Sequence, residues 1–301
     1  MTLSDRRILL VHAHPDDEVI GTGTTMAKYV AEGAQVTLVT CTAGEEGEVL
    51  VPELEHLASH RDDALGPHRV GELADAMKVI GVTDHRFLGG TGHFRDSGMK
   101  WAEDGTATAA DETRADTFWH ADLTVASDLM AQIIREVRPH VLVTYDEFGN
   151  YGHPDHVQAH RVATYGAALA GVRSYKAQLG EPWDVPKIYW TAMSKSQMST
   201  SIRALREAGD ETTFEGWDPQ NIPWGSPDDE LDSVVDGDAF ADVKMDAMRA
   251  HATQITVDGP FFALSNNLGN QVWGKEFFRL AKGELGPVGP DGFEEDLFAG
   301  L

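Results

Sequence analysis

The chain has 301 residues, of which 49 are acidic and 24 are basic, so its formal net charge is −25. A hydrophobic fraction of 42% is typical of a globular protein that buries a large core. Because so negative a field repels phosphates and anionic lipids, we expect neither nucleic acid nor a membrane as a partner.

The N-terminal residues and the single cysteine indicate the compartment. The first apolar run is short and ends in His-Ala-His at residues 12–14, so it predicts neither a signal peptide nor a membrane span. Cys41 has no partner for an intrachain disulfide, and its apolar neighbours favour a buried core residue over a nucleophile. We therefore expect a protein of the reducing cytoplasm.

Strand-like and helix-like segments alternate through the first half of the chain. Apolar runs predict strands at residues 7–12, 35–42, 85–88 and 140–145. Helical periodicity predicts helices at residues 22–32, 61–80 and 123–137. Alternation at this spacing predicts an α/β fold, with a Rossmann-like parallel sheet flanked by helices on both faces.

The alternation is interrupted by two long polar stretches and weakens after about residue 170. Residues 44–60 and 89–119 follow predicted strands and are therefore expected near a ligand. Farther along, the pattern predicts a strand at 187–193, helices at 195–208 and 239–252, and a mobile acidic tail at 283–296. We predict a catalytic core that carries a metal site, residues 1–170. A smaller C-terminal portion, residues 171–301, is expected to pack on it and line the substrate pocket.

Two clusters of ionisable residues follow predicted strands. They read His14-Pro15-Asp16-Asp17-Glu18 and Tyr151-Gly152-His153-Pro154-Asp155-His156. Such groups at buried strand ends need partners or a metal ion to offset their desolvation. Three ligands of the His and carboxylate type, with a position open for water, are typical of catalytic zinc, and His14, Asp17 and His156 can supply them.

Structural roles for these clusters, or a non-catalytic metal site, are the alternatives. The additional groups Asp16, Tyr151 and His153 argue against a closed structural site, which would not require them. We expect His12 to be a core or supporting histidine, and His160 to pack or hydrogen-bond near the site rather than to bind metal. The glycines at residues 21–26 resemble a dinucleotide fingerprint, but Met26 and the acidic cluster argue against NAD.

The patterns H-P-D-D-E and G-H-P-D-H resemble the PIG-L/LmbE-type zinc deacetylases, and the similarity runs nearly end to end. It is strongest to the branch that serves mycothiol biosynthesis. The further blocks that carry it lie at residues 39–49, 69–73, 95–99, 140–145, 251–254 and 264–268.

The resemblance implies one catalytic metal ion per subunit, held by His14, Asp17 and His156. Zinc is expected, although two histidines and an aspartate with an open position also suit ferrous iron. Asp16 matches the family's general base, which removes a proton from the attacking water.

The resemblance also implies roles on the side of the departing amine. His153 matches the general acid, Asp155 is expected to orient it and favour its charged form, and Tyr151 matches a residue that steadies the oxyanion. The residues at positions that resemble contacts to sugar or inositol hydroxyls are Arg69, Asp96 and Glu48.

The expected substrate is a small sugar-inositol, N-acetylglucosaminyl-inositol, whose acetamide is hydrolysed to acetate and a free amine. The alternatives are a mycothiol S-conjugate amidase and a non-catalytic glycan-binding module. Residues 19–23 (VIGTG) lack the lysine expected in the amidase, and a binding module would need neither Asp16 nor His153. The sequence predicts no particular oligomeric state.

Overall fold

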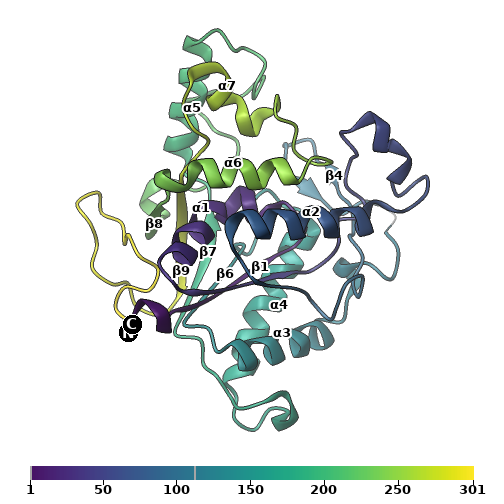
Figure 1. The fold of residues 1–301 in the computed structure, drawn as a ribbon, viewed down its shortest axis with the longest axis vertical. Coiled ribbons are helices and arrows are strands. Elements are labelled where there is room, and N and C mark those ends of the chain that lie inside the picture. Colours follow the sequence, from purple (N-terminus) through teal and green to yellow (C-terminus); the bar gives the residue numbers. More distant parts are fainter. Residues whose placement is uncertain (1, 112) are drawn as a thin grey trace.

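A computed structural model describes residues 2–111 and 113–301 and shows a seven-stranded sheet between layers of helices (Figure 1). In spatial order the strands are β3 (Asp84–Phe87), β2 (Gln35–Thr40), β1 (Arg7–His12), β6 (Val141–Thr144), β7 (Lys187–Ala192), β9 (Lys275–Lys282) and β8 (Ser233–Asp236). The strands from β3 to β7 are parallel, whereas β9 and β8 each run antiparallel to their neighbours. The predicted α/β fold with a mostly parallel sheet is confirmed.

The helices cover both faces of this sheet. They are α1 (Asp17–Ala31), α2 (Leu65–Ile80), α3 (Leu123–Val137), α4 (Pro154–Gly171), α5 (Lys195–Glu207), α6 (Ala241–Ala250) and α7 (Ala263–Leu268). In β1, Ile8 and Leu10 pack into a core with α1, α2 and α6, whereas Leu9 and Val11 pack into a second core with α3 and α4. Successive side chains of a strand point to opposite faces, which explains why the four central residues of β1, Ile8 to Val11, are all apolar.

Helix α1 begins five residues before the predicted start, at Asp17 in the acidic cluster. Carboxylates are favourable in a first helical turn, so the cluster is compatible with a helix N-terminus. Thr22 breaks the helix with φ −143°, and its hydroxyl donates to the carbonyl of Glu18 at 2.9 Å. The tertiary structure therefore joins the acidic cluster and the predicted helix into one kinked element.

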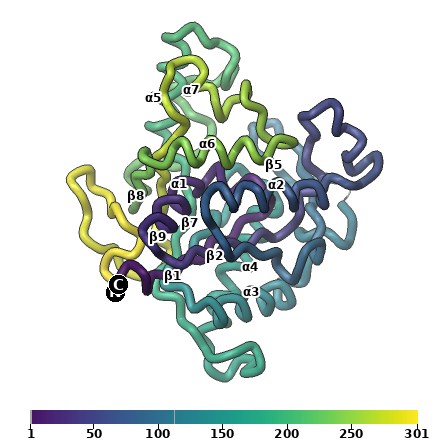
Figure 2. The backbone as a smooth tube through the Cα atoms, in the orientation of Figure 1, coloured from purple at the N-terminus to yellow at the C-terminus, as the bar shows by residue number. Residues whose placement is uncertain are grey.

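The acidic tail, which we expected to be mobile, is mostly exposed at residues 283–292 but is fixed at its end, so mobility stays a prediction for its exposed part alone. Lys187 Nζ lies 2.6 Å from the buried Glu294 carboxylate, and Leu297 and Phe298 are buried in the core. The two termini lie side by side (Figures 1 and 2), where Arg6 pairs with Asp296 at 2.8 Å. The buried ion pair of Glu294, and the buried side chains of Leu297 and Phe298 that follow it, hold this end of the chain against the core.

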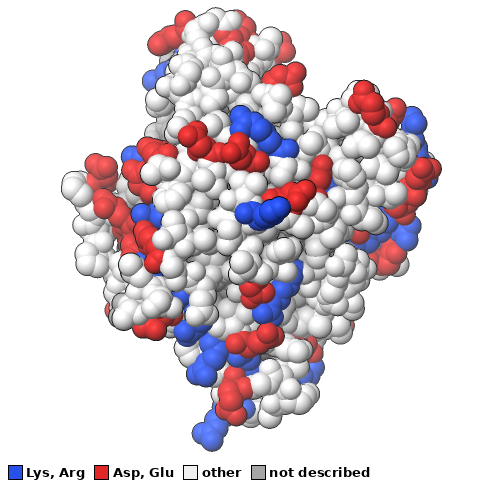
Figure 3. All heavy atoms as spheres, viewed as in Figure 1, with Lys and Arg blue, Asp and Glu red and all other residues white. Residues whose placement is uncertain are grey.

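Strands from both sides of residue 170 share the one sheet, and the division of the chain at that residue stays a prediction. Helices α5 and α7 stand above α6 in Figure 1, where Met198, Ile202 and Ile222 form a small separate cluster. Within the two described ranges, none of the helices combines the length and apolar composition that a bilayer span requires. On the face drawn in Figure 3, basic side chains are scattered among acidic ones.

Candidate metal centre

Both clusters of ionisable residues lie at the point where the order of the sheet reverses. Strands β1 and β6 are neighbours, but the chain continues from β1 to β2 on one side and from β6 to β7 on the other. Open α/β sheets bind ligands at the carboxyl ends of such strands. The first cluster follows β1 and leads into α1, and the second follows β6 and leads into α4. The fold thus brings together two segments that are far apart in sequence.

Asp17 lies between the two predicted histidine ligands. One carboxylate oxygen, Oδ2, is 3.2 Å from His14 Nδ1, and the other, Oδ1, is 3.3 Å from His156 Nε2. Burial opposes the ionisation of this carboxyl, but the adjacent His156 and His14 hold its pKa well below the usual value. Asp17 is therefore an anion that faces both imidazoles, as a shared metal site requires.

The surroundings of His156 fit a cation. The ring is buried, and neither of its nitrogens has a hydrogen-bond partner among the described residues. An unsatisfied buried polar group costs free energy, and a coordinated metal ion removes that cost at one nitrogen. His14, His153 and His156 also bring ring nitrogens within 4.8 Å of one another, so His153 is a competing ligand. These donors suit zinc.

The far side of His14 is held by acidic groups. His14 Nε2 lies 3.2 Å from Asp155 Oδ2 and 3.5 Å from Asp96 Oδ1. Although burial opposes it, these neighbours and Asp17 raise the pKa of His14 well above its usual value. A carboxylate behind a ligating histidine fixes the ring and increases its basicity. Asp155 therefore supports His14, with its own oxygens further fixed by the main-chain N–H and hydroxyl of Ser97.

This arrangement corrects the role that we expected for Asp155. Its carboxylate contacts Ser97 and His14, and the hydrogen bond to His153 comes instead from the Asp155 main-chain N–H, which donates to Nδ1 at 3.1 Å. Burial, together with the nearby His14 and His156, lowers the pKa of His153 well below its usual value. Asp155 is the second residue of α4, and His153 is the N-cap of that helix. The surroundings of His153 therefore disfavour its charged form, contrary to the expectation that Asp155 favours it.

Asp16, the predicted base, is held in a strained conformation beside the ligands. Its φ is +118°, which is rare for a residue other than glycine and recurs at functional sites. The Glu18 carboxylate accepts from its main-chain N–H at 2.8 Å, and the Arg69 guanidinium donates to its side chain at 3.1 Å. Burial raises the pKa of Asp16 to about 6, against the opposing charge of Arg69. A carboxylate with a raised pKa is a stronger base.

The three predicted substrate contacts differ in their surroundings. Arg69 is buried and donates to the carbonyls of Gly44 and Pro15 as well as to Asp16. Asp96 is also buried and accepts from the main-chain N–H groups of residues 46 and 98 at 3.1 and 2.8 Å. Glu48 is exposed, and its carbonyl accepts a hydrogen bond from Gln254. A role in substrate binding stays a prediction for all three.

Tyr151 and His153 lie beside the ligands, as a role in catalysis requires. The centroid of the Tyr151 ring is 5.1 Å from that of His156, with the planes nearly perpendicular. The His153 ring is 4.5 Å from His14 and 5.0 Å from His156. Both side chains therefore line the same centre, and their assigned roles as oxyanion donor and acid stay predictions.

The sequence analysis did not identify Tyr145 as part of the site. Its hydroxyl donates to Asp17 Oδ2 at 2.9 Å and accepts from the Ala13 N–H at 2.9 Å, and its ring is stacked on His156 at 4.2 Å. Tyr145 directly follows β6, at the sheet edge where both clusters lie, and this position could have identified it as a site residue. The expectations for the two other histidines agree with the structure. His12 contacts Tyr145 and Thr22 in the core, and His160 bonds to the Tyr145 carbonyl.

We expect Tyr145→Phe to weaken metal binding about tenfold, the lower end of what a residue behind a metal ligand contributes. The variant keeps the ring on His156 but removes the donor to Asp17. Tyr29→Phe is the matched control, because that buried hydroxyl also accepts from a main-chain N–H, of Leu297, and donates to a carboxylate, of Asp296. Competition with a chelator gives the affinity, and thermal unfolding of the metal-free proteins gives their stability. Equal metal affinity in both variants would contradict this role.

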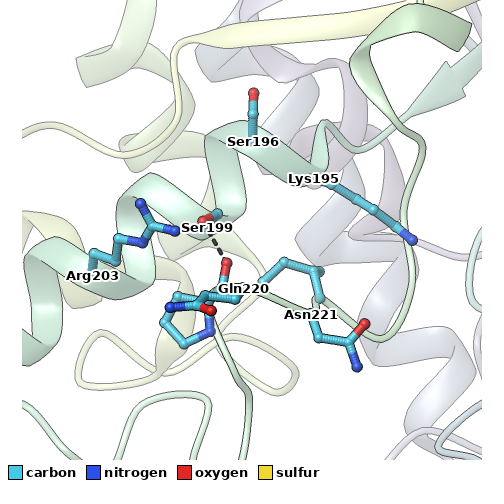
Figure 4. A pocket seen from close by; sticks show the side chains of 8 residues that line it. Lys195, Ser196, Ser199, Arg203, Gln220 and Asn221 are labelled. Atoms are coloured by element: carbon cyan, nitrogen blue, oxygen red, sulfur yellow. Dashed lines mark hydrogen bonds between the residues drawn. The ribbon is translucent and has the colours of Figure 1, made fainter.

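A further hollow of about 370 Å³ lies between α5 and the loop at residues 219–222 (Figure 4). It is open and polar, and Ser199 on its wall donates to the carbonyl of Pro219 at 2.5 Å. None of the predicted site residues lines it, so we place the chemistry at the metal centre instead.

Comparison with known proteins gives close relatives over the whole chain. The family described as GlcNAc-PI de-N-acetylase (PIG-L) matches residues 9–166. The 1D-myo-inositol 2-acetamido-2-deoxy-alpha-D-glucopyranoside deacetylase of Kribbella flavida is 66% identical over 301 residues, 99% of either chain. The protein of the same name from a Nocardioides species is 66% identical over 299 residues, again 99% of either chain.

Among solved structures, N,N'-diacetylchitobiose deacetylase from Pyrococcus horikoshii, complexed with an inhibitor, has the same fold. Its TM-score is 0.59, and the match covers 91% of this chain and 83% of that one. At 18% sequence identity the likeness establishes the fold alone.

Proposed function

Because this chain belongs to the PIG-L family of GlcNAc-PI de-N-acetylases, we propose that it hydrolyses the acetamide of N-acetylglucosaminyl-inositol in mycothiol biosynthesis. Relatives named for this activity match it at 66% identity from end to end. The single structural observation that carries the proposal is Asp17 between two buried imidazoles, with the strained Asp16 beside it. The products are acetate and glucosaminyl-inositol.

One zinc ion on His14, Asp17 and His156 is the proposed cofactor. The unpartnered nitrogens of His156 and the anionic Asp17 support this ligand set, and the acidic groups behind His14 strengthen it. When bound, zinc supplies a positive charge that polarises the acetamide carbonyl and lowers the pKa of water. Side chains of this protein carry out the proton transfers and stabilise the oxyanion.

Asp16 is the proposed acceptor of the proton that the attacking water loses. Its raised pKa makes it a stronger base than an exposed aspartate, and Arg69 fixes the carboxylate in one orientation. Glu18 holds the main-chain N–H of Asp16, and His251 lies 2.7 Å from the other oxygen of Glu18. Two buried residues thus keep the strained turn in place while the base acts.

His153 and Tyr151 act on the other side of the reacting carbon. As the tetrahedral oxyanion forms, its negative charge raises the pKa of the neighbouring His153, which takes up a proton from solvent and holds it for the departing amine. The Tyr151 hydroxyl is the proposed donor to that oxyanion. The C–N bond breaks when the amine nitrogen takes the proton from His153.

Acetate release from N-acetylglucosaminyl-inositol, measured with the purified protein before and after metal removal, tests this function. We expect turnover that chelation abolishes and added zinc restores. Faster hydrolysis of mycothiol S-conjugates would instead identify the amidase, and bound metal without hydrolysis of either compound would identify a binding module. The proposed compartment is the cytoplasm, where the buried thiol of Cys41 stays reduced, and cell fractionation tests it.

A further inference from the structure

Tyr151 lies between two tryptophans from separate segments of the chain. The ring of Trp101 is 5.9 Å from that of Tyr151 with the planes 32° apart, and the ring of Trp224 is 6.3 Å away at 44°. The Tyr151 ring in turn lies 5.1 Å from His156. We refer to Trp101, Tyr151 and Trp224 as the aromatic wall, which extends from the metal centre towards solvent.

Trp101 at the outer end of this wall is held in place and yet exposed. It lies in the hairpin of β4 (Lys100–Trp101) and β5 (Ala107–Thr108), labelled in Figures 1 and 2, opposite Ala107. The Ala107 N–H donates to the Tyr151 carbonyl at 2.8 Å. Gly152 has φ +101°, and a Cβ there would stand 2.4 Å from the Ala107 carbonyl oxygen, so glycine permits this close approach.

The exposure of Trp101 is not explained by packing. The side chain is 62% exposed, although the hairpin that carries it is hydrogen-bonded to the loop of a residue that we place in catalysis. Trp101 is continuous with Tyr151 and Trp224, and contiguous apolar patches at the surface commonly mark ligand-binding sites. The ring therefore offers a fixed, unused face at the entrance to the metal centre.

The polar residues predicted to bind the substrate do not by themselves account for binding of a sugar or cyclitol ring. Arg69 and Asp96 already bond to main-chain groups of the protein, as described above, so part of their capacity for binding hydroxyls is occupied. A pyranose or cyclitol ring has C–H groups on its faces and hydroxyls around its rim. The C–H face packs against the electron-rich face of an aromatic ring, while the rim stays free for hydrogen bonds.

We propose that the aromatic wall is a stacking subsite for the cyclitol half of the substrate, with Trp101 beneath that ring. The inference rests on the proposed function for the identity of the substrate. The acetamide must reach the metal centre, so the glucosamine ring lies near Tyr151 and the ring attached to it extends outward. Trp101 is the member of the wall that reaches farthest into solvent.

The test compares N-acetylglucosaminyl-inositol with N-acetylglucosamine, which lacks the outer ring. The preference for the inositol conjugate is measured as the ratio of the two kcat/KM values. For Trp101→Ala we expect this ratio to fall about tenfold, mainly because KM for the conjugate rises. A tenfold loss is within the range measured when a ring stacked on an aromatic side chain loses that partner. Trp101→Phe should retain most of the preference. Tyr165→Ala, which removes a 42% exposed ring on α4, is the control and should leave it unchanged.

Three outcomes would overturn the subsite. One is an equal loss on both substrates, another is a loss confined to kcat, and the third is no change in Trp101→Ala. If the wild-type protein hydrolyses neither compound, the proposed function fails by itself. Calorimetric titration with glucosaminyl-inositol and with glucosamine then tests the stacking proposal. The proposal requires that Trp101→Ala weaken the binding of glucosaminyl-inositol and leave the binding of glucosamine unchanged.

Discussion

Asp16→Asn is expected to retain its metal ion and to lose about 10²- to 10⁴-fold in kcat, the usual contribution of a general base. The amide keeps an acceptor for the Arg69 guanidinium but cannot take a proton from water. Asparagine also tolerates positive φ better than most residues, so the turn at +118° should persist. Steady-state kinetics combined with metal analysis of the same sample measures both quantities.

Asp63→Asn is the matched control for that experiment. Asp63 is also an aspartate with positive φ, +51°, and its carboxylate also pairs with an arginine, Arg95, at 2.6 Å. It makes no contact with the metal centre among the described interactions, so its turnover should stay close to that of the wild type. If Asp16→Asn turned over normally, or if it lost the metal while Asp17→Ala kept it, the assignments of base and ligand would be wrong.

The second large effect is expected from Asp17→Ala, which should weaken metal binding by at least about a hundredfold, more than the loss of a supporting residue costs. Asp17 is the residue that faces both His14 and His156, and its removal takes away the carboxylate that the two imidazoles share. Metal content after dialysis and chelator competition measure the change, and folding is checked by far-UV circular dichroism.

A comparison of His156→Ala with His153→Ala separates the two possible sets of ligands. We expect His156→Ala to lose the metal and His153→Ala to retain it while kcat falls. His153 caps α4 by accepting from the Asp155 N–H, so thermal unfolding of the metal-free variants is measured alongside to correct for the lost cap. Loss of the metal in both variants would instead assign it to the group of His14, His153 and His156.

The sequence by itself determined the parallel strands of the sheet and the general place of the site, but it did not predict the antiparallel strands β8 and β9. Residues 7–12 form β1 as predicted, and residues 123–137 form α3, because an apolar run or an amphipathic period is a local property. The clusters at 14–18 and 151–156 were also identifiable, since ionisable groups after buried strands need a reason to be there. Resemblance to known deacetylases then indicated the reaction.

Only the tertiary structure decided which side chains touch. Asp155 lies two residues from His153 but supports His14, which is 141 residues away, because the first turn of α4 directs the carboxylate towards β1. Tyr145 joins the centre for the same reason, since the register between β1 and β6 brings its hydroxyl to Asp17. The end of the acidic tail is likewise held by Lys187, which pairs with Glu294 from 107 residues away. Local pattern determines elements, whereas hydrogen-bond partners depend on how distant strands align.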